Sequence, residues 1–220
     1  MILNKITLRD IPLFSGITED ELPGLNALLK PSIRYATEGE FLTYPGDIIK
    51  EIGILLDGKI HMVSEDFWGN QNIIAEFTKG SFFGEAHSIS GDPMFFSLIS
   101  VEQTTLLFLN TQRILNSSVH NDTGIQKLYD NLLSAIIQKK LNYMRKADIL
   151  SRRSLREKVS AFLSEEYRKQ SSSSFTIPYD RQQMADYLSV DRSALSRELS
   201  KMKKEGILEY RHNQFQLKSM

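Results

Sequence analysis

"DRQQMADYLSVDRSALSRELSKMKKEGILEYRHNQFQL", residues 180–217, has the most specific pattern in this sequence. Asp180 with Gln183 forms a capping-box pattern at the start of one helix, and Asp191 can cap a second helix. The apolar residues of the two segments recur at helical spacing and are expected to face inward: Met184, Ala185, Leu188, Leu195, Leu199 and Met202. Two short helices at this spacing, followed by a small hairpin around His212-Asn213, are typical of a winged helix-turn-helix.

The second of these helices carries a polar outer face. We expect five side chains on it: Arg192, Ser193, Ser196, Arg197 and Lys201. The N-terminal part of such a helix lies in the major groove of DNA, where arginine can read guanine and lysine can contact phosphate. The pattern therefore predicts sequence-specific binding to double-stranded DNA. The alternative is an ordinary helical hairpin whose arginines are solvated.

The distribution of charge favours the DNA-binding interpretation. Residues 1–110 contain 7 basic and 15 acidic residues, whereas residues 111–220 contain 20 basic and 12 acidic residues. An acidic first half and a basic second half indicate that only the second half meets a polyanion. A chance division of solvated surface charge is the alternative reading of the same numbers.

The first half of the chain has the pattern of a β domain. After a helix expected over residues 18–30, short apolar runs separated by turn residues continue to about residue 109. Asp57-Gly58 and Trp68-Gly69-Asn70 each stand between two such runs, which is a hairpin signal. Strands this short and frequent predict a jelly roll, sandwich or small barrel. With the helical second half, the fold class is α+β.

A long helix is expected between these parts. An apolar stripe runs along it at spacings near 3.5: Ile125, Tyr129, Leu132, Ile136, Tyr143, Ala147 and Leu150. Such a stripe predicts that two copies pair as a homodimer, although it could instead pack on the strand domain. The expected domains are a jelly-roll sensor domain at 1–110, a dimerisation helix region at 111–150 and a winged helix-turn-helix domain at 151–220. Within the last of these, another helix is expected at 154–169.

Five segments occur in the order and spacing of one known family. "PLFSGITEDEL", "YPGD", "ILLDGKI", "GSFFGE" and "VDRSALSREL" together resemble the Crp/Fnr family of bacterial transcription regulators, and the resemblance covers nearly the whole chain. It implies a cyclic-nucleotide-binding-type sensor domain, a homodimer, a palindromic DNA operator and RNA polymerase as a possible partner. Relatives often have an acidic base-reading residue where this sequence has Ser193.

The resemblance also defines candidate effector-binding residues. In cyclic-nucleotide-responsive members a Gly-Glu pair contacts the ribose, a later Arg-Ser or Arg-Thr pair grips the phosphate, and the pairing helix adds hydroxyl groups. The matching positions here are Gly84, Glu85, Phe95 or Phe96, Ser97, Leu141 and Asn142. Phe96 stands at the arginine position, and no Lys or Arg occurs from Ser81 to Gln112. Because a buried phosphate needs a cation, we predict an effector other than a cyclic nucleotide.

Three interpretations of this loop stay open. It could hold an uncharged or aromatic molecule, its apolar residues could be core with no ligand, or an anion could use a cation from elsewhere, such as Arg145. At the level of the whole protein, the alternatives to an effector-controlled regulator are an effector-independent regulator and a binding or scaffold protein that has kept the fold.

Enzymatic chemistry is not indicated. The sequence has no cysteine, no P-loop, no dinucleotide fingerprint and no nucleophile elbow, and its histidines occur singly rather than in metal-binding units. His87 could be one haem ligand, but no second axial ligand can be named. We expect no cofactor and no metal. The absence of a long apolar stretch predicts no membrane span, and the absence of cysteine fits a cytoplasmic protein.

Overall fold

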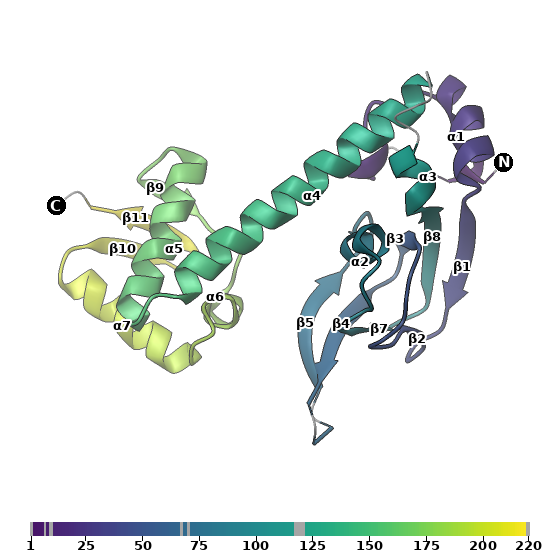
Figure 1. The fold of residues 1–220 in the computed structure, drawn as a ribbon. Coiled ribbons are helices and arrows are strands. Elements are labelled where there is room, and N and C mark those ends of the chain that lie inside the picture. The colour runs from purple at the N-terminus through teal and green to yellow at the C-terminus, as the bar shows by residue number, and fades with distance from the viewer. Residues whose placement is uncertain are drawn as a thin grey trace. The chain divides into compact units, whose positions relative to one another are not determined.

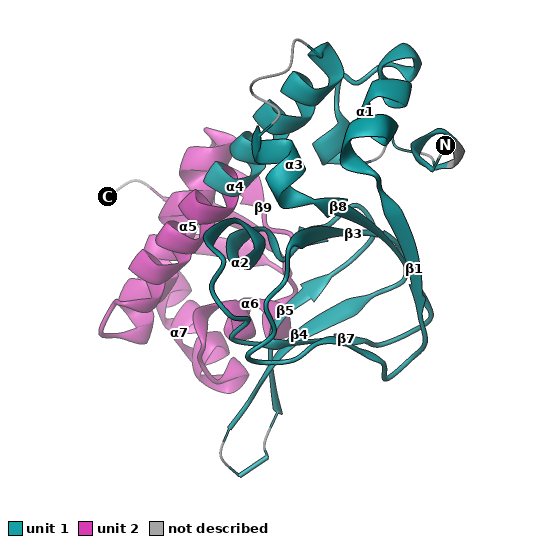
Figure 2. Ribbon diagram, turned by 45° about the vertical axis from the view of Figure 1, so that its right-hand side comes forward, with its two compact units in different colours: residues 1–137 teal, residues 138–220 magenta. Residues whose placement is uncertain are grey.

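Figure 1 shows the chain as a computed structural model. The structure describes residues 2–6, 8, 11–66, 68, 69, 71–116 and 122–218. Two compact units divide the chain at residues 137 and 138, and Figure 2 colours them separately. The division falls within one long helix, α4 (Thr123–Leu150), which contributes residues to both units.

The first unit contains short strands, as its frequent turn residues predict. Its elements are η1 (Leu3–Lys5), η2 (Pro12–Phe14), η3 (Glu19–Glu21), α1 (Leu22–Leu29), β1 (Ser32–Ala36), β2 (Phe41–Thr43), β3 (Glu51–Asp57), β4 (Ile60–Glu65), β5 (Gln71–Phe77), β6 (Phe82–Phe83), α2 (Glu85–Ser90), β7 (Ser97–Ser100), β8 (Thr104–Asn110) and α3 (Thr111–Leu115). Two four-stranded antiparallel sheets form, ordered β1-β8-β3-β6 and β2-β7-β4-β5. One buried cluster joins residues from both sheets: Leu55, Ile60, Phe83, Met94, Leu98 and Leu106. The predicted jelly-roll domain is confirmed.

The Asp57-Gly58 turn joins the two sheets instead of two paired strands. β3 pairs with β6 and β8, whereas β4 pairs with β5 and β7, so the predicted hairpin at this turn is wrong. The second predicted hairpin is present as the pair β4 and β5, although Asn70 lies outside the described residues. A turn signal between two apolar runs therefore marks a reversal of the chain but not which strand each run will pair with.

Gly58 shows why this crossing needs glycine. Its φ is +91°, and a Cβ at this position would lie 2.5 Å from Thr104 Cγ2. Gly39 has a similar φ of +79°, but a Cβ there would meet nothing within 4 Å.

We expect Gly58→Ala to lower the free energy of unfolding more than Gly39→Ala does. Both variants place alanine in the left-handed region, at a cost of about 1 kcal/mol. Only Gly58→Ala adds overpacking against Thr104, which is worth about 1–3 kcal/mol further. Urea unfolding followed by circular dichroism measures both, and equal losses in the two variants would contradict the steric argument.

Helices cover the outer face of the sheet that contains β1. η3 begins with a capping box between Thr18 and Glu21, and α1 follows it directly. The largest buried cluster combines the N-terminal segment, α1, β3, β8 and α3 with the start of α4, which contributes Ile125, Leu128 and Leu132. The first part of α4 is therefore held by the strand domain of its own chain.

The first part of the predicted apolar stripe on α4 is covered by the strand domain. Ile125 and Leu132 are buried in this core, and Tyr129 and Ile136 pack against it. For Ile125 and Leu132 this is the alternative that the sequence left open, packing on the strand domain of the same chain, while pairing with a second copy stays a prediction. Tyr143, which belongs to the stripe, is exposed, and so are four large apolar side chains outside the stripe: Leu133, Ile137, Leu141 and Met144.

The second unit, coloured separately in Figure 2, contains the end of α4, further helices and a small sheet. It contains α5 (Leu155–Gln170), β9 (Ser174–Thr176), α6 (Arg181–Leu188), α7 (Arg192–Lys204), β10 (Leu208–Arg211) and β11 (Gln214–Leu217). The strands are ordered β10-β11-β9. The six residues predicted to face inward are all buried in one core with α5. The predicted winged helix-turn-helix is confirmed.

Both predicted caps are present in this unit. The backbone N–H of Gln183 donates to Asp180 Oδ1 at 2.8 Å, and the N–H of Asp180 donates to Gln183 Oε1 at 2.9 Å. The N–H of Ala194 donates to Asp191 Oδ1 at 2.8 Å. These local bonds fix where α6 and α7 begin, and hence which side chains stand at the start of each helix.

Candidate DNA-binding surface and effector-binding residues

The polar face of α7 carries the residues that the sequence predicted. Arg192, Ser193, Arg197 and Lys201 are exposed and Ser196 is half-buried. The opposite side of the helix is anchored in the core by its buried residues, Leu195, Leu199 and Met202. A rigid helix therefore presents one hydroxyl-rich, cationic surface, which is the arrangement that a major-groove reading helix needs.

Two hydrogen bonds organise the start of this surface. Ser193 Oγ donates to Asp191 Oδ1 at 2.5 Å, and Arg197 Nη1 donates to Ser193 Oγ at 3.1 Å. The hydrogen bond from Ser193, together with that from the Ala194 N–H, holds the pKa of Asp191 below its usual value. A capping carboxylate is thus linked through one hydroxyl to the guanidinium that projects from the next turn.

Arg181 belongs to the same surface region and was missed by the sequence analysis. Its guanidinium lies 5.1 Å from the ring centre of Tyr210 and donates to the carbonyl of His212 at 3.2 Å. Burial lowers the pKa of Arg181, and the charge of Arg192 lowers it further. The wing therefore holds one arginine close to another, and the two are the first residues of α6 and α7.

A sequence signal for Arg181 did exist. A cation in the first turn of a helix opposes the helix dipole, which favours anions there. Both Arg181 and Arg192 take this unfavourable position directly after a capping aspartate. Two neighbouring helix starts that each expose backbone N–H groups and an arginine can bind phosphate oxygens.

The wing itself is tied to α7. Lys203 Nζ lies 2.7 Å from Glu209 Oε2, and Lys218 Nζ lies 3.3 Å from Glu209 Oε1. A hydrogen bond from Lys203 and a smaller effect of a hydrogen bond from Lys218 hold the pKa of Glu209 below its usual value. These exposed pairs orient the hairpin more than they stabilise the fold.

The candidate effector loop of the first unit surrounds α2. Gly84 is the N-cap of this helix, and a Cβ there would lie 2.8 Å from Ile49 Cδ1. Glu85, Phe96 and Ser97 are half-buried, whereas Phe95 is 66% exposed. The loop therefore presents one aromatic ring to solvent beside partly covered polar groups.

His87 has a structural role in this loop. Its ring meets that of Phe95 edge-to-face at 4.9 Å, and its Nδ1 lies 3.3 Å from the carbonyl oxygen of Asp92, within hydrogen-bonding distance. Within the described ranges, no group of three or more His, Cys, Asp or Glu side chains could hold a metal ion. The contacts of His87 agree with a hydrogen-bonding and packing residue.

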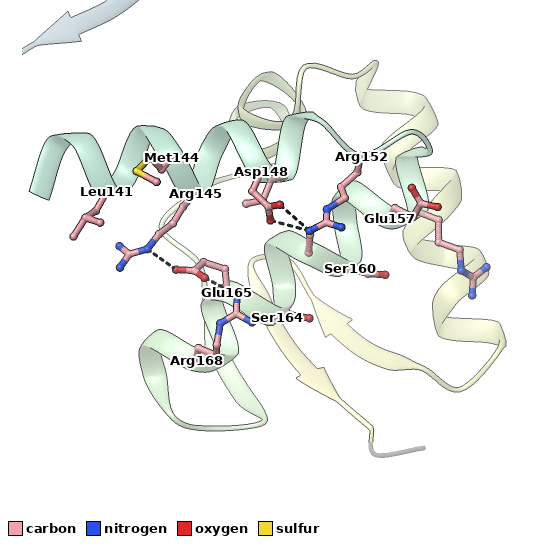
Figure 3. A pocket seen from close by; sticks show the side chains of 13 residues that line it. Leu141, Met144, Arg145, Asp148, Arg152, Glu157, Ser160, Ser164, Glu165 and Arg168 are labelled. Atoms are coloured by element: carbon pink, nitrogen blue, oxygen red, sulfur yellow. Dashed lines mark hydrogen bonds and ion pairs between the residues drawn. The ribbon is translucent and has the colours of Figure 1, made fainter.

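The remaining candidates belong to the second unit. A hollow of about 790 Å³ lies between α4 and α5. Leu141, Met144 and Arg145 are among the side chains that line it (Figure 3). Arg145 Nε lies 3.3 Å from Glu165 Oε1, and Arg145 Nη1 donates to Asn142 Oδ1 at 3.2 Å. The cation that an anionic effector could borrow is thus already paired with a carboxylate of its own unit.

The other arginines of this hollow are paired as well. Arg152 lies 2.8 Å from Asp148 Oδ1, and Arg168 lies 2.7 Å from Glu165 Oε2. Arg156 forms ion pairs with Glu198 and Glu205 of α7 and its end. The hydrogen bond from Arg168 is the main cause that holds the pKa of Glu165 below its usual value. The positive charge of these arginines is therefore compensated by carboxylates of the same unit.

No helix among the described residues is both long and apolar enough to cross a membrane.

Comparison with known proteins identifies both parts of the chain. Residues 33–117 match the family model of the cyclic nucleotide-binding domain, and residues 157–220 match that of the Crp-like helix-turn-helix domain. A comparison with curated protein sequences finds no match.

Solved structures of the same architecture cover most of the chain. The catabolite activator protein of Thermus thermophilus is similar with a TM-score of 0.55 and 21% identity, over 94% of this chain and 93% of that chain. The c-di-GMP-responsive global regulator CLP of Xanthomonas campestris has a TM-score of 0.53 and 17% identity, over 92% and 100%. CprK in complex with OCPA has a TM-score of 0.58 and 18% identity, over 90% and 88%.

Identities this low show a common fold and nothing about the ligand. The two family models, in this order on one chain, carry the assignment. The protein belongs to the Crp/Fnr family of bacterial transcription regulators.

Proposed function

We propose that this regulator acts as a homodimer, that it reads a palindromic operator through α7, and that its effector is not a cyclic nucleotide. The observation that carries operator reading is the exposed face of α7, where the buried apolar side of the helix leaves Arg192 and Arg197 on the outer side and Asp191 caps its start. A surface of this shape and charge fits the major groove of B-DNA.

The contacts suggest a division of roles. Arg192 and Arg197 reach base edges, guanine being the preferred partner of an arginine fork. Ser193, hydrogen-bonded to Asp191 and Arg197, sets the direction of Arg197. Phosphate contacts that position the helix come from Lys201, Ser196 and the half-buried Arg181. Because Ser193 stands where relatives often have an acid, the operator should differ from the familiar one at the base pair that this acid reads.

We expect Arg197→Ala to cost about 1–3 kcal/mol of binding free energy and to relax preference at one base pair. Lys201→Ala is the matched control, since loss of a phosphate contact weakens binding to all sequences alike. The operator is first obtained by selection from random duplexes, and affinities are then measured at one salt concentration for it and its single-base-pair variants. A uniform loss for Arg197→Ala would contradict base reading, and a selection without a palindrome would favour a scaffold protein.

Exposed apolar side chains on α4 support the proposed dimer. Leu133, Ile137, Leu141 and Met144 are exposed and follow one another at spacings of four, four and three residues. Side chains at this spacing share one side of a helix, and an apolar side of this kind is covered when two such helices pair. Pairing around a two-fold axis would place two α7 helices on half-sites about one helical turn apart.

Ile137→Lys is expected to shift the protein toward monomer, because the new charge would be buried in the apolar seam. Gln138→Lys adds the same charge at an exposed position on another side of the helix and should leave the dimer intact. Light scattering at micromolar concentration measures both variants. A monomeric wild-type protein, or equal effects of the two substitutions, would contradict this seam.

The character of the effector loop supports a ligand without a buried anion. Phe96 is half-buried at the position that the family uses for arginine, and Phe95 exposes an aromatic face beside it. CLP of Xanthomonas campestris responds to c-di-GMP, an anion. Carrying that property over would need a cation, and residues 81–112 contain none. An uncharged aromatic molecule would instead gain contact with both phenylalanines, with Glu85 and Ser97 as orienting groups.

Cyclic AMP and cyclic GMP are therefore expected to bind weakly or not at all in isothermal titration. Loss of the cation that pairs with a desolvated phosphate is worth about 3 kcal/mol, or more than about a hundredfold in affinity. Phe96→Arg should raise the affinity for cyclic AMP, whereas Phe95→Arg, at the exposed neighbour, should not. Micromolar binding by the wild-type protein would overturn the prediction and make Arg145 the next residue to substitute.

A further inference from the structure

The C-terminal half of α7 is tied to α5 by one arginine. Arg156 is the second residue of α5, and its guanidinium contacts two carboxylates of α7 and its end. Its Nη1 lies 3.5 Å from Glu198 Oε1 and donates to Glu205 Oε1 at 3.2 Å, while its Nη2 donates to Glu205 Oε2. The roles proposed above for DNA contacts do not use this group.

Glu198 and Glu205 lie on the same side of α7. They are seven residues apart in the sequence, which is close to two full turns of an α-helix and about 10 Å along its axis. One guanidinium therefore holds α7 at two points along its length. Because a planar fork of N–H donors fixes direction as well as distance, rotation of α7 about its axis would break at least one of these contacts.

The carboxylate of Glu198 depends on this contact. Its side chain is 18% exposed, and Oε1 is one of two buried side-chain atoms without a hydrogen bond among the described residues. A carboxylate oxygen that is shielded from water needs a cation nearby. Arg156 supplies that cation from the neighbouring helix.

The position of Arg156 indicates a role beyond stability. The side chains of Arg156 and Glu205 are 36% and 37% exposed, and ion pairs this exposed contribute little to the free energy of unfolding. Arg156 also stands in the first turn of α5, where the helix dipole disfavours a cation. A charge that opposes a local rule and adds little to the fold is typical of a functional position.

The other anchors of α7 restrain its rotation less directly. Leu195, Leu199 and Met202 are buried in the core, but burial of apolar surface has no preferred direction. Asp191 caps the start of the helix, and Lys203 joins its end to the wing through an exposed pair. A binding surface must hold its side chains within about 0.5 Å and about 10–20° of the productive geometry. The two carboxylate contacts of Arg156 add a directional restraint of this kind.

We propose that Arg156 is a positioning residue for operator reading. Through Glu198 and Glu205 it sets the rotation of α7, and this rotation determines the direction in which Arg192 and Arg197 leave the helix. The inference rests on the proposed reading of base edges by α7. Loss of Arg156 should therefore weaken discrimination between the operator and other DNA, while charge-driven binding to any duplex is largely kept.

The test compares the Kd for a random duplex with the Kd for the selected operator, at one salt concentration and with the full chain. We call the first value divided by the second the discrimination ratio. Arg156→Gln is expected to lower this ratio about tenfold. Arg168→Gln is the matched control, since it removes the same charge from α5 but its partner is Glu165 of the same helix, and it should keep the ratio of the wild-type protein. An unchanged ratio in Arg156→Gln, or equal losses in the two variants, overturns the proposal.

Glu198→Gln gives a readout in which charge and orientation act in opposite directions. Removal of a negative charge from α7 should tighten binding to the random duplex, whereas loss of the partner of Arg156 should lower the discrimination ratio. The variant that combines Glu198→Gln with Arg156→Gln should have a ratio no lower than that of Arg156→Gln alone, because the contact is already absent. A combined loss equal to the product of the two single losses overturns the coupling.

Thermal unfolding followed by circular dichroism shows whether each variant is folded. If Arg156→Gln does not fold, Glu198→Gln carries the test by itself, and an unchanged or higher discrimination ratio in that variant overturns the proposal.

Single-base-pair variants of the operator separate this inference from the proposed function. Arg197→Ala should relax preference at one base pair, whereas Arg156→Gln should relax it at every base pair that α7 reads. Relaxation by Arg197→Ala with none by Arg156→Gln overturns the positioning role and leaves base reading by α7 in place. Relaxation by neither variant, or a selection that yields no operator, overturns base reading and this inference with it.

Discussion

The hydrophobic burial of α4 is the constraint on which the rest of this structure depends. The helix of 28 residues gives Ile125, Leu128 and Leu132 to the core of the strand domain and Ile149 to the core of the second unit. Each end is therefore fixed by removal of apolar surface from water, the dominant favourable term in folding. Any change in the position or rotation of this helix must be felt in both cores, because packed interiors do not deform continuously.

The middle of α4 gives a second set of apolar side chains to neither of these two cores. Leu133, Ile137, Leu141 and Met144 stay exposed on one side of α4. A regulator of this family that pairs through these residues would join its two reading helices to its two sensor domains through a single apolar contact. The interaction that assembles the protein would then also be the one through which an effector acts on DNA binding.

The candidate DNA-binding surface contains charges in unfavourable positions. Arg181 and Arg192 occupy helix N-termini, where their charge opposes the helix dipole, and burial further lowers the pKa of Arg181. The capping aspartates fix where the two helices begin, and the ring of Tyr210 lies 5.1 Å from the guanidinium of Arg181. Local rules are thus broken at these two helix starts, whereas they are obeyed in the core of the same unit.

Local chemistry was determined by the sequence alone. The caps at Asp180 and Asp191, the buried residues of α6 and α7 and the polar face with Arg192 and Arg197 could all be predicted, because each depends on neighbours within one or two helical turns. The missing cation of the effector loop was equally visible, since it is a statement about residue types in one segment. These features needed no knowledge of how distant parts of the chain meet.

Tertiary structure alone decided the contacts between distant segments. The Asp57-Gly58 turn separates strands that pair in different sheets, because the partners of β3 are β6 and β8, which come much later in the sequence than β4. The first half of the stripe on α4 packs against the strand domain of its own chain. The spacing of apolar residues shows that this face is buried, but it does not show which surface covers it. The sequence determines which faces must be buried, but only the folded chain determines what covers them, because the hydrophobic effect has no direction.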